Sequence, residues 1–159
     1  MTGDNGRLYI STKTYNHSVG LSCCFRQWRA ESHCRFLHGY ALKVHIKFGS
    51  HGLDERNWVV DFGSLKTFKK DLETFLDHKT LVASDDPELE TFRKLHEKGL
   101  IQLVLVPSTG CESVAHMIYS MAEDWLASNR ISTQDRSVWV EEVEVAEHEG
   151  NSAIVRRLK

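Results

Sequence analysis

The sequence has few cysteines and no apolar run long enough to cross a membrane. Its four cysteines, Cys23, Cys24, Cys34 and Cys111, are irregularly spaced and form no CxxC pair, so they predict neither a disulfide framework nor a structural zinc site. A membrane span needs about 20 apolar residues, and the opening MTGDNGRLYI lacks the apolar centre of a secretion signal. We therefore expect free thiols, a cytoplasmic location and no membrane partner.

An excess of positive charge is also missing. The chain has 22 acidic and 20 basic residues, which predicts no broad cationic surface for a phosphate backbone and argues against nucleic acid as a partner. No repeat, low-complexity tract or linker interrupts the 159 residues, a length typical of one compact domain. The sequence therefore predicts a single domain over residues 1–159.

Apolar periodicity in the first half predicts two strands and a long helix. Leu21, Cys23 and Phe25 alternate with more polar neighbours, and alternation resumes from Tyr40 to Phe48, which is typical of two antiparallel strands. Between Phe62 and Leu76 the apolar residues recur at spacings of three and four. That spacing predicts one buried stripe on an amphipathic helix.

The second half predicts two more helices. One begins after Ser84-Asp85-Asp86, with Pro87 in its first turn and Gly99 at its end. The segment 101–106 is a short strand or a buried extended segment, and a third helix follows Ser108-Thr109-Gly110, with apolar residues from Val114 to Leu126.

Two strands end the chain. The apolar phase of the segment 138–145 slips by one residue at Glu141-Glu142, which a β-bulge explains. A turn at Glu149-Gly150-Asn151 then leads into a final strand over 153–158. Strands, helices and strands in this order predict an α+β fold: a four-stranded antiparallel sheet with helices on one face.

The segment CRFLHGY places Cys34 four residues before His38, at the turn between the first two predicted strands. A thiol and an imidazole this close in sequence can serve proton transfer or bind a metal. The structural alternative for Cys34 is a small buried apolar residue, which free cysteine often is. For His78, the alternative is a loop histidine that bonds the end of the preceding helix.

Five segments resemble the 6-pyruvoyl- and 6-carboxy-tetrahydropterin synthase family, whose members serve biopterin or queuosine biosynthesis. They occur in the family's order and span most of the chain. They are CRFLHGY, WVVDFGSLK, LDHK at residues 76–79, ESVA at residues 112–115 and VEVAE at residues 143–147. The resemblance implies the tunnelling fold, in which subunits join their sheets into an oligomeric barrel, commonly a homohexamer, with pterin sites between subunits.

The resemblance implies catalytic roles for three residues. Cys34 stands at the family's catalytic thiol, and Asp77 with His78 match its relay pair. Moving a proton at a carbon beside a reduced pterin ring requires a base held by an oriented partner. A thiolate near imidazolium or arginine can serve this purpose near neutral pH.

Substrate-binding residues are also implied. Glu147 matches the glutamate that anchors the pterin, because a carboxylate can accept hydrogen bonds from the ring's 2-amino and N3 groups. Glu112 matches less well, since it also suits the first turn of a helix. Arg26 and Arg35, which flank Cys34 in sequence as Arg29 also does, are candidates to bind the triphosphate of dihydroneopterin triphosphate. The alternative is that these arginines are solvated surface residues.

The sequence departs from the family at the metal. The family binds zinc through three histidines, and these positions are Phe25, His38 and Tyr40 here. One imidazole is too few for a zinc site, which needs about three protein ligands. We therefore expect no cofactor, with His38 the only inherited metal ligand. A remodelled zinc site of Cys23, His38 and Tyr40 stays open as the alternative.

These observations lead to one main hypothesis and two alternatives. The main hypothesis is a pterin-transforming lyase that acts on dihydroneopterin triphosphate or a related dihydropterin. Because zinc supplies Lewis-acid stabilisation, a chain without it suits retro-aldol cleavage, epimerisation or another elimination. The alternatives are a non-catalytic module that binds a pterin or purine, and a purely structural oligomer.

Overall fold

The computed structural model describes residues 6–158. This part of the chain forms seven strands and three α-helices, with two short 3₁₀ helices, η1 and η2, before and after the second strand. The elements in chain order are β1 (Tyr9–Tyr15), η1 (His17–Val19), β2 (Leu21–Phe25), η2 (His33–Arg35), β3 (His38–Ser50), α1 (Leu65–Leu76), β4 (Lys79–Ala83), α2 (Leu89–Glu97), β5 (Leu103–Val106), α3 (Cys111–Ser128), β6 (Val138–His148) and β7 (Asn151–Arg156).

The long strand β3 organises a single mixed sheet. One edge of β3 pairs with β2 near its start and with β1 further along, while the other edge pairs with β6, which pairs with β7. Strands β4 and β5 extend the sheet beyond β2 in parallel. The α+β class is confirmed, but the prediction of four antiparallel strands is wrong, because β1, β4 and β5 join the same sheet.

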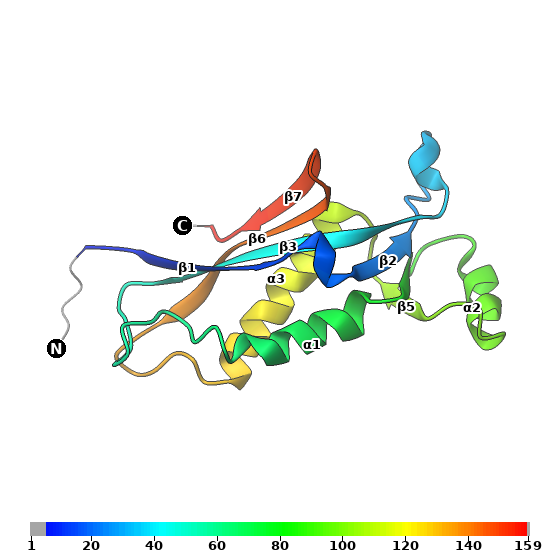
Figure 1. The fold of residues 1–159 in the computed structure, drawn as a ribbon. Helices are drawn as coiled ribbons and strands as arrows, with labels where there is room; N and C mark the ends of the chain where they lie inside the picture. Colours follow the sequence, from blue (N-terminus) through cyan, green and yellow to red (C-terminus); the bar gives the residue numbers. More distant parts are fainter. Residues whose placement is uncertain (1–5, 159) are drawn as a thin grey trace.

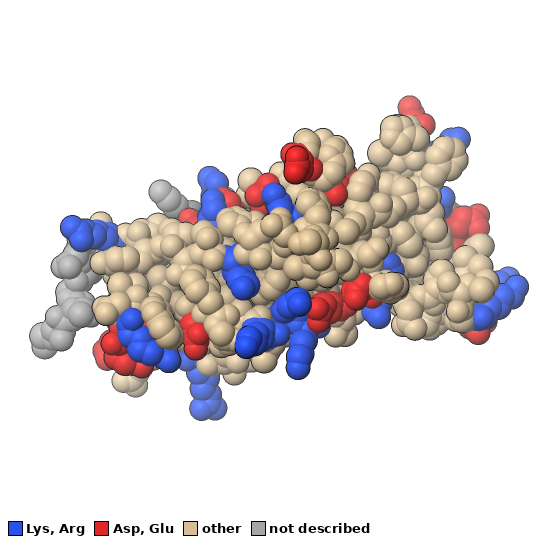
Figure 2. Space-filling model, in the orientation of Figure 1, with Lys and Arg blue, Asp and Glu red and all other residues tan. Residues whose placement is uncertain are grey.

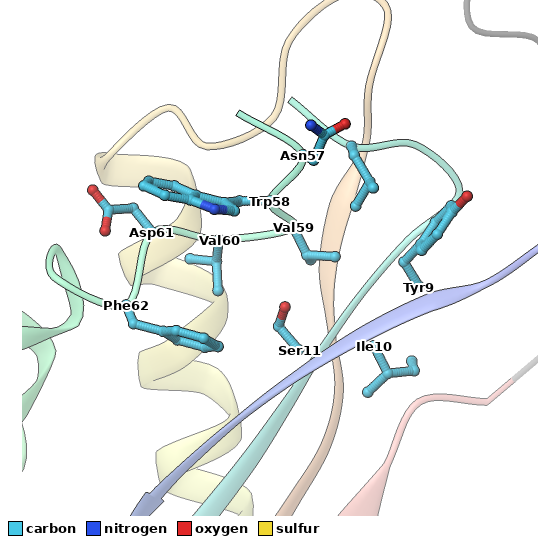
Figure 3. A pocket seen from close by; sticks show the side chains of 10 residues that line it. Tyr9, Ile10, Ser11, Asn57, Trp58, Val59, Val60, Asp61 and Phe62 are labelled. Atoms are coloured by element: carbon cyan, nitrogen blue, oxygen red, sulfur yellow. The ribbon is translucent and has the colours of Figure 1, made fainter. Parts of the chain in front are cut away.

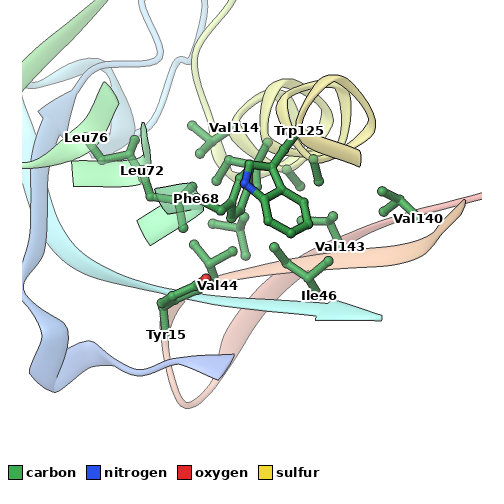
Figure 4. Packing of buried hydrophobic residues seen from close by; sticks show 14 of the residues in the cluster. Tyr15, Val44, Ile46, Phe68, Leu72, Leu76, Val114, Trp125, Val140 and Val143 are labelled. Atoms are coloured by element: carbon green, nitrogen blue, oxygen red, sulfur yellow. The ribbon is translucent and has the colours of Figure 1, made fainter. Parts of the chain in front are cut away.

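Helices α1 and α3 lie on the same face of the sheet (Figure 1). Their apolar stripes pack on alternate residues of β3 and β6, such as Val44, Ile46 and Val143, all fully buried. Trp125 of α3 and Phe68 of α1 meet above this layer with ring centroids 6.2 Å apart (Figure 4). The predicted stripe of α1 is correct from Leu65 onward.

The predicted start of the long helix is wrong. The helix begins at Leu65, and Phe62 lies before it with 51% of its surface exposed. The Asp61 side chain accepts a hydrogen bond from the Gly63 amide, and the Asp61 carbonyl accepts one from the Ser64 hydroxyl. These bonds hold residues 61–64 in a turn that precedes the helix.

The predicted β-bulge in β6 is confirmed. Lys47 pairs with Glu142 and Phe48 pairs with Val140, which leaves Glu141 without a partner on β3. The extra residue shifts the phase of the strand, so Val140 and Val143 both face the helices. Glu142 therefore lies on the opposite face, where it forms ion pairs with Lys47 and Arg156.

The described residues contain no helix that is long and apolar enough to span a membrane. On the face seen in Figure 2, basic and acidic side chains are scattered among uncharged ones. This pattern agrees with the near balance of charge in the sequence. It offers no extended basic surface on that side of the molecule.

Candidate active site

Three aromatic rings meet where β2 ends and β3 begins. Phe25 and His38 are partners across the two strands, and Tyr40 lies two residues further along β3, on the same face. The His38 ring centroid lies 5.5 Å from that of Phe25 and 5.5 Å from that of Tyr40. Gly39 lets the strands approach this closely, since a Cβ there would lie 2.7 Å from the Cys23 carbonyl oxygen.

The turn between β2 and β3 carries Cys34 to the same place. The Ser32 hydroxyl accepts a hydrogen bond from the Cys34 amide at the start of η2. The Cys34 carbonyl accepts a bond of 2.9 Å from the Gln27 amide. These two bonds fold the turn back against the end of β2, and the thiol is left half-buried.

A second bulge in β6 brings Glu147 to the site. Ala146 pairs with Ser152 and His148 pairs with Asn151, so Glu147 has no partner on β7. A bulge places consecutive residues against one partner residue. Glu147 therefore lies beside His148, whose ring centroid is 6.4 Å from that of Tyr40.

These elements enclose a cavity of about 390 Å³ at one end of the sheet. The first turn of α3 closes it with Cys111 and Glu112. Four of the residues predicted from sequence thus line one cavity: Cys34, His38, Glu112 and Glu147. The complete lining is Phe25, Gln27, Cys34, His38, Tyr40, Cys111, Glu112, Glu147, Gly150, Asn151 and Ser152.

Burial and charge set the protonation of two lining groups. Burial raises the pKa of the Tyr40 phenol, and the Glu147 carboxylate raises it further. Burial, with a contribution from Glu147, raises the pKa of the Cys111 thiol to about 11. Both groups are therefore protonated at neutral pH, and the Cys111 thiol donates a hydrogen bond of 2.9 Å to the Val145 carbonyl.

Comparison with known proteins identifies the family. Residues 15–158 match the model of the family described as "6-pyruvoyl tetrahydropterin synthase". The chain belongs to the 6-pyruvoyl tetrahydropterin synthase family. The 6-carboxy-5,6,7,8-tetrahydropterin synthase of Aquifex aeolicus is 28% identical over 83 residues, which cover 52% of this chain and 51% of that protein. The match therefore spans about half the length of this curated relative.

Solved structures share the fold over nearly the whole chain. An uncharacterized protein of Wolinella succinogenes, WS1659, superimposes with a TM-score of 0.78 at 22% identity, covering 96% of this chain and 99% of that one. The 6-pyruvoyl tetrahydropterin synthase of Plasmodium falciparum superimposes with a TM-score of 0.62 at 17% identity, covering 94% and 98%. At these identities the likeness concerns the fold.

Asp77 and His78, which match the synthase family's relay pair, lie near the start of β2, whereas the cavity lies at its end. His78 has a positive φ of 57°, its amide donates to the Ser22 carbonyl, and its ring nitrogen lies 2.6 Å from an Asp77 carboxylate oxygen. The His78 side chain is 86% exposed. Asp77 and His78 do not line the cavity of their own chain, so a role for them there requires a neighbouring subunit.

The arginines near Cys34 point to other partners. Arg26 forms two hydrogen bonds, of 2.8 and 2.6 Å, with the buried carboxylate of Asp86, and these bonds hold the pKa of Asp86 below its usual value. The Arg35 guanidinium lies over the Phe36 ring, 5.0 Å from its centroid. Neither Arg26 nor Arg35 lines the cavity.

The residues at the synthase family's zinc positions do not fit zinc. Phe25 offers no ligand atom, the Tyr40 phenol is protonated at neutral pH, and His38 alone supplies an imidazole. Cys23, the extra ligand of the remodelled site, is 4% exposed, and burial raises the pKa of its thiol to about 12. Among residues 6–158, no group of three or more His, Cys, Asp and Glu side chains is arranged to hold a metal ion.

Sequence reasoning missed several cavity residues: Gln27, Cys111, Gly150, Asn151 and Ser152. Asn151 and Ser152 follow the predicted turn after β6, so the hairpin itself was the available signal. Gln27 and Cys111 gave no such signal, because their positions depend on contact between distant segments. The side-chain amide of Gln27 donates a hydrogen bond of 3.1 Å to the Thr109 carbonyl. This bond joins the end of β2 to the loop before α3.

A second hollow of about 430 Å³ lies beside β1. The side chains of Trp58 and Phe62 lie along it, with Ile10 and Ser11 of β1 on the other side (Figure 3). Among the described residues that line it, Asp61 is the only carboxylate, and none is a histidine or a cysteine. Its lining therefore provides an apolar surface rather than a constellation for proton transfer.

Proposed function

We propose that the protein is a lyase of the tetrahydropterin synthase family that binds a dihydropterin in the 390 Å³ cavity. The observation that carries the proposal is the convergence of Cys34 and Glu147 on one cavity, although 113 positions separate them in sequence (147 − 34). In this proposal the Glu147 carboxylate accepts hydrogen bonds from the 2-amino and N3 groups of the ring. The curated synthase of Aquifex aeolicus supports the substrate class.

Cys34 is the proposed acid/base group. Among the described cysteines, Cys34 and Cys111 line the cavity, and Cys111 is fixed as a thiol by burial and by its bond to Val145. Cys34 would therefore remove and return a proton at the side-chain carbon next to the ring. Epimerisation at that carbon removes a proton from it and returns one on the opposite face. Retro-aldol cleavage removes a proton from the hydroxyl of the next carbon, breaks the carbon–carbon bond to release an aldehyde, and returns a proton to the carbon next to the ring. Neither reaction needs an oxidant or a second substrate.

The proposed reaction proceeds without the three-histidine zinc site. The support is the chemistry of the three positions, where a phenylalanine and a protonated tyrosine accompany His38. The Tyr40 phenol can donate a hydrogen bond to a side-chain oxygen of the substrate. Asp77 and His78 stay proposed relay residues, contributed by a neighbouring copy, and a cytoplasmic location stays a prediction.

The proposed binding role of Glu147 can be tested by calorimetry with biopterin. Because hydrogen bonds to a charged group contribute about 1.5–3 kcal/mol, Glu147→Gln should weaken binding by about 10- to 100-fold. Glu144→Gln is the matched control, since Glu144 is three residues away on β6 and does not line the cavity. Equal affinity of the wild-type protein and Glu147→Gln would remove Glu147 from the site.

We also propose that copies of the chain assemble through their sheet edges. In the described part of the chain β1 and β7 each pair on one side only, and open edges of this kind readily pair with another strand. The apolar hollow lies beside β1, with Trp58 43% exposed and Ile10 40% exposed. A neighbouring copy that pairs with β1 would cover these side chains.

Light scattering coupled to gel filtration tests the assembly. The wild-type protein should have a mass of several chains, and Trp58→Glu should reduce that mass, because the contact would bury an unpaired charge. Leu100→Glu is the control, since Leu100 is 67% exposed and lies outside the hollow. A wild-type mass equal to one chain would contradict the proposal.

A further inference from the structure

We propose that His148 is a positioning residue, which holds the β6–β7 hairpin in the shape that binds the pterin only while its imidazole is neutral. The inference rests on the proposed function and adds a pH response to the same site. Four of the residues that line the cavity stand in this hairpin: Glu147, Gly150, Asn151 and Ser152. A change in the turn would therefore move the carboxylate assigned to the ring together with its neighbours.

The His148 ring is bonded across the turn. Its Nδ1 accepts a hydrogen bond of 3.0 Å from the Gly150 amide, and its Nε2 lies 3.1 Å from the side-chain amide nitrogen of Asn151. The contact is close, since a Cβ added at Gly150 would lie 3.1 Å from the imidazole Cε1. The ring also neighbours Tyr40 of the cavity, with centroids 6.4 Å apart. One side chain thus joins the two strands of the hairpin beside the cavity.

The bond from Gly150 defines the protonation state of the ring. A backbone amide only donates, so Nδ1 of His148 must be free of a proton in order to accept. The proton of the neutral ring is then on Nε2, where it can donate to the Asn151 side-chain oxygen once that amide group is turned by 180°. A second proton would have to be added at Nδ1. It would point at the Gly150 N–H and replace the hydrogen bond by a contact between two donors.

Protonation of His148 should therefore release the turn, and binding should weaken as the pH falls. Histidine ordinarily changes its charge between about pH 8 and pH 5. Strand β7 faces the ring with the uncharged Asn151. Tyr40 of β3 and Cys111 of α3 stay protonated over this range, because burial raises the pKa of both groups. The carboxylates beside the ring in sequence or in the same cavity are Glu112, Glu147 and Glu149.

Calorimetry with biopterin on the full-length assembled protein tests the inference at about pH 8 and about pH 5.5. The wild-type protein is compared with His148→Asn and His148→Ala. An asparagine oxygen can accept the bond from the amide two residues further on, as in an Asx turn, and asparagine does not titrate. At about pH 8 we expect His148→Asn to bind within about twofold of the wild-type protein. His148→Ala should bind about 3- to 10-fold more weakly, the effect of one lost hydrogen bond.

The ratio of the wild-type affinity to that of His148→Asn isolates the imidazole. At about pH 5.5 the wild-type protein should bind about 3- to 10-fold more weakly than His148→Asn, because protonation breaks the bond that asparagine keeps. The carboxylates, and a His78 contributed by a neighbouring copy, are present in both proteins, so their titration cancels in the ratio. His96→Asn is the matched control, since His96 is exposed on α2 and does not line the cavity. It should follow the wild-type protein at both pH values.

The outcomes separate this inference from the proposed function. A ratio that is the same at both pH values would overturn the inference and leave the proposed function standing. Binding by His148→Asn as weak as that of His148→Ala at about pH 8 would overturn it as well, since the bond to Gly150 would then not be what the imidazole provides. Failure of the wild-type protein to bind biopterin at either pH would overturn the proposed function itself.

Discussion

Cys34→Ala is expected to reduce turnover of a dihydropterin by about 100- to 10,000-fold, the usual contribution of general acid/base catalysis. The proposed mechanism gives Cys34 the proton transfer and gives Glu147 the ring, so binding of biopterin should change by less than about twofold. Steady-state kinetics with dihydroneopterin, together with calorimetry, measure both quantities on the same preparations. A loss of turnover without a loss of affinity would assign Cys34 to the chemical step.

Cys24→Ser provides the matched control for this experiment. The Cys24 thiol lies 3.2 Å from the Thr80 hydroxyl, outside the cavity, and a serine can keep that contact. Turnover by Cys24→Ser should therefore equal that of the wild-type protein. If Cys34→Ala retained full activity, Cys34 would be excluded as the acid/base group. If the wild-type protein left every dihydropterin unchanged while binding biopterin, the non-catalytic module would replace the lyase.

The combined variant Phe25→His and Tyr40→His is expected to bind close to one zinc ion per chain. The two positions and His38 lie on one face of paired strands, and the three rings now have centroids between 5.5 and 6.3 Å apart. The His38 Nδ1 lies 2.6 Å from the Phe36 carbonyl oxygen. As a donor to that carbonyl, it would leave Nε2 for the metal. Three imidazoles with one open position are a common zinc site.

Elemental analysis after dialysis measures the bound zinc, with the wild-type protein and the two single variants beside the double variant. Each single variant has only two imidazoles and should bind far less zinc. Because Phe25 is 1% exposed, its replacement by histidine should also lower the melting temperature, and zinc should restore part of that loss. A folded double variant without zinc would show that positions 25, 38 and 40 do not converge.

The fold could be predicted wherever apolar and polar residues alternate, because one face of the element is covered and the other is exposed. The strand β3, the stripe of α1 after Leu65 and the bulge at Glu141 all place apolar residues on one covered face, and their periodicity shows this directly. Strand β4 gives no such signal. Four of its five residues, Thr80 to Ala83, are buried on both faces between β2 and β5, so it lacks the alternation of a half-covered strand.

Part of the candidate site could also be predicted, because some of its residues stand in recognisable local sequence patterns. Cys34, His38 and Glu147 stand in segments whose local sequence is distinctive, and the structure brings all three to one cavity. The arginines could not be placed in this way. Whether Arg26 faces a ligand or Asp86 depends on a loop 60 residues away, and no local pattern reports such a contact. Arg26 forms an ion pair with Asp86 within the chain, and its role in binding a triphosphate stays a prediction.

The unpaired residue near the end of β6 has an implication for how this pocket can change. Two consecutive side chains, Glu147 and His148, stand opposite a single residue of β7 there. Adding or removing one amino acid at that point would replace one side chain of the cavity by another. The hydrogen bonds between β6 and β7 on either side of the bulge would stay in place. Variation in hairpin length, as well as substitution, is thus a route by which a scaffold of this kind can acquire a different ligand.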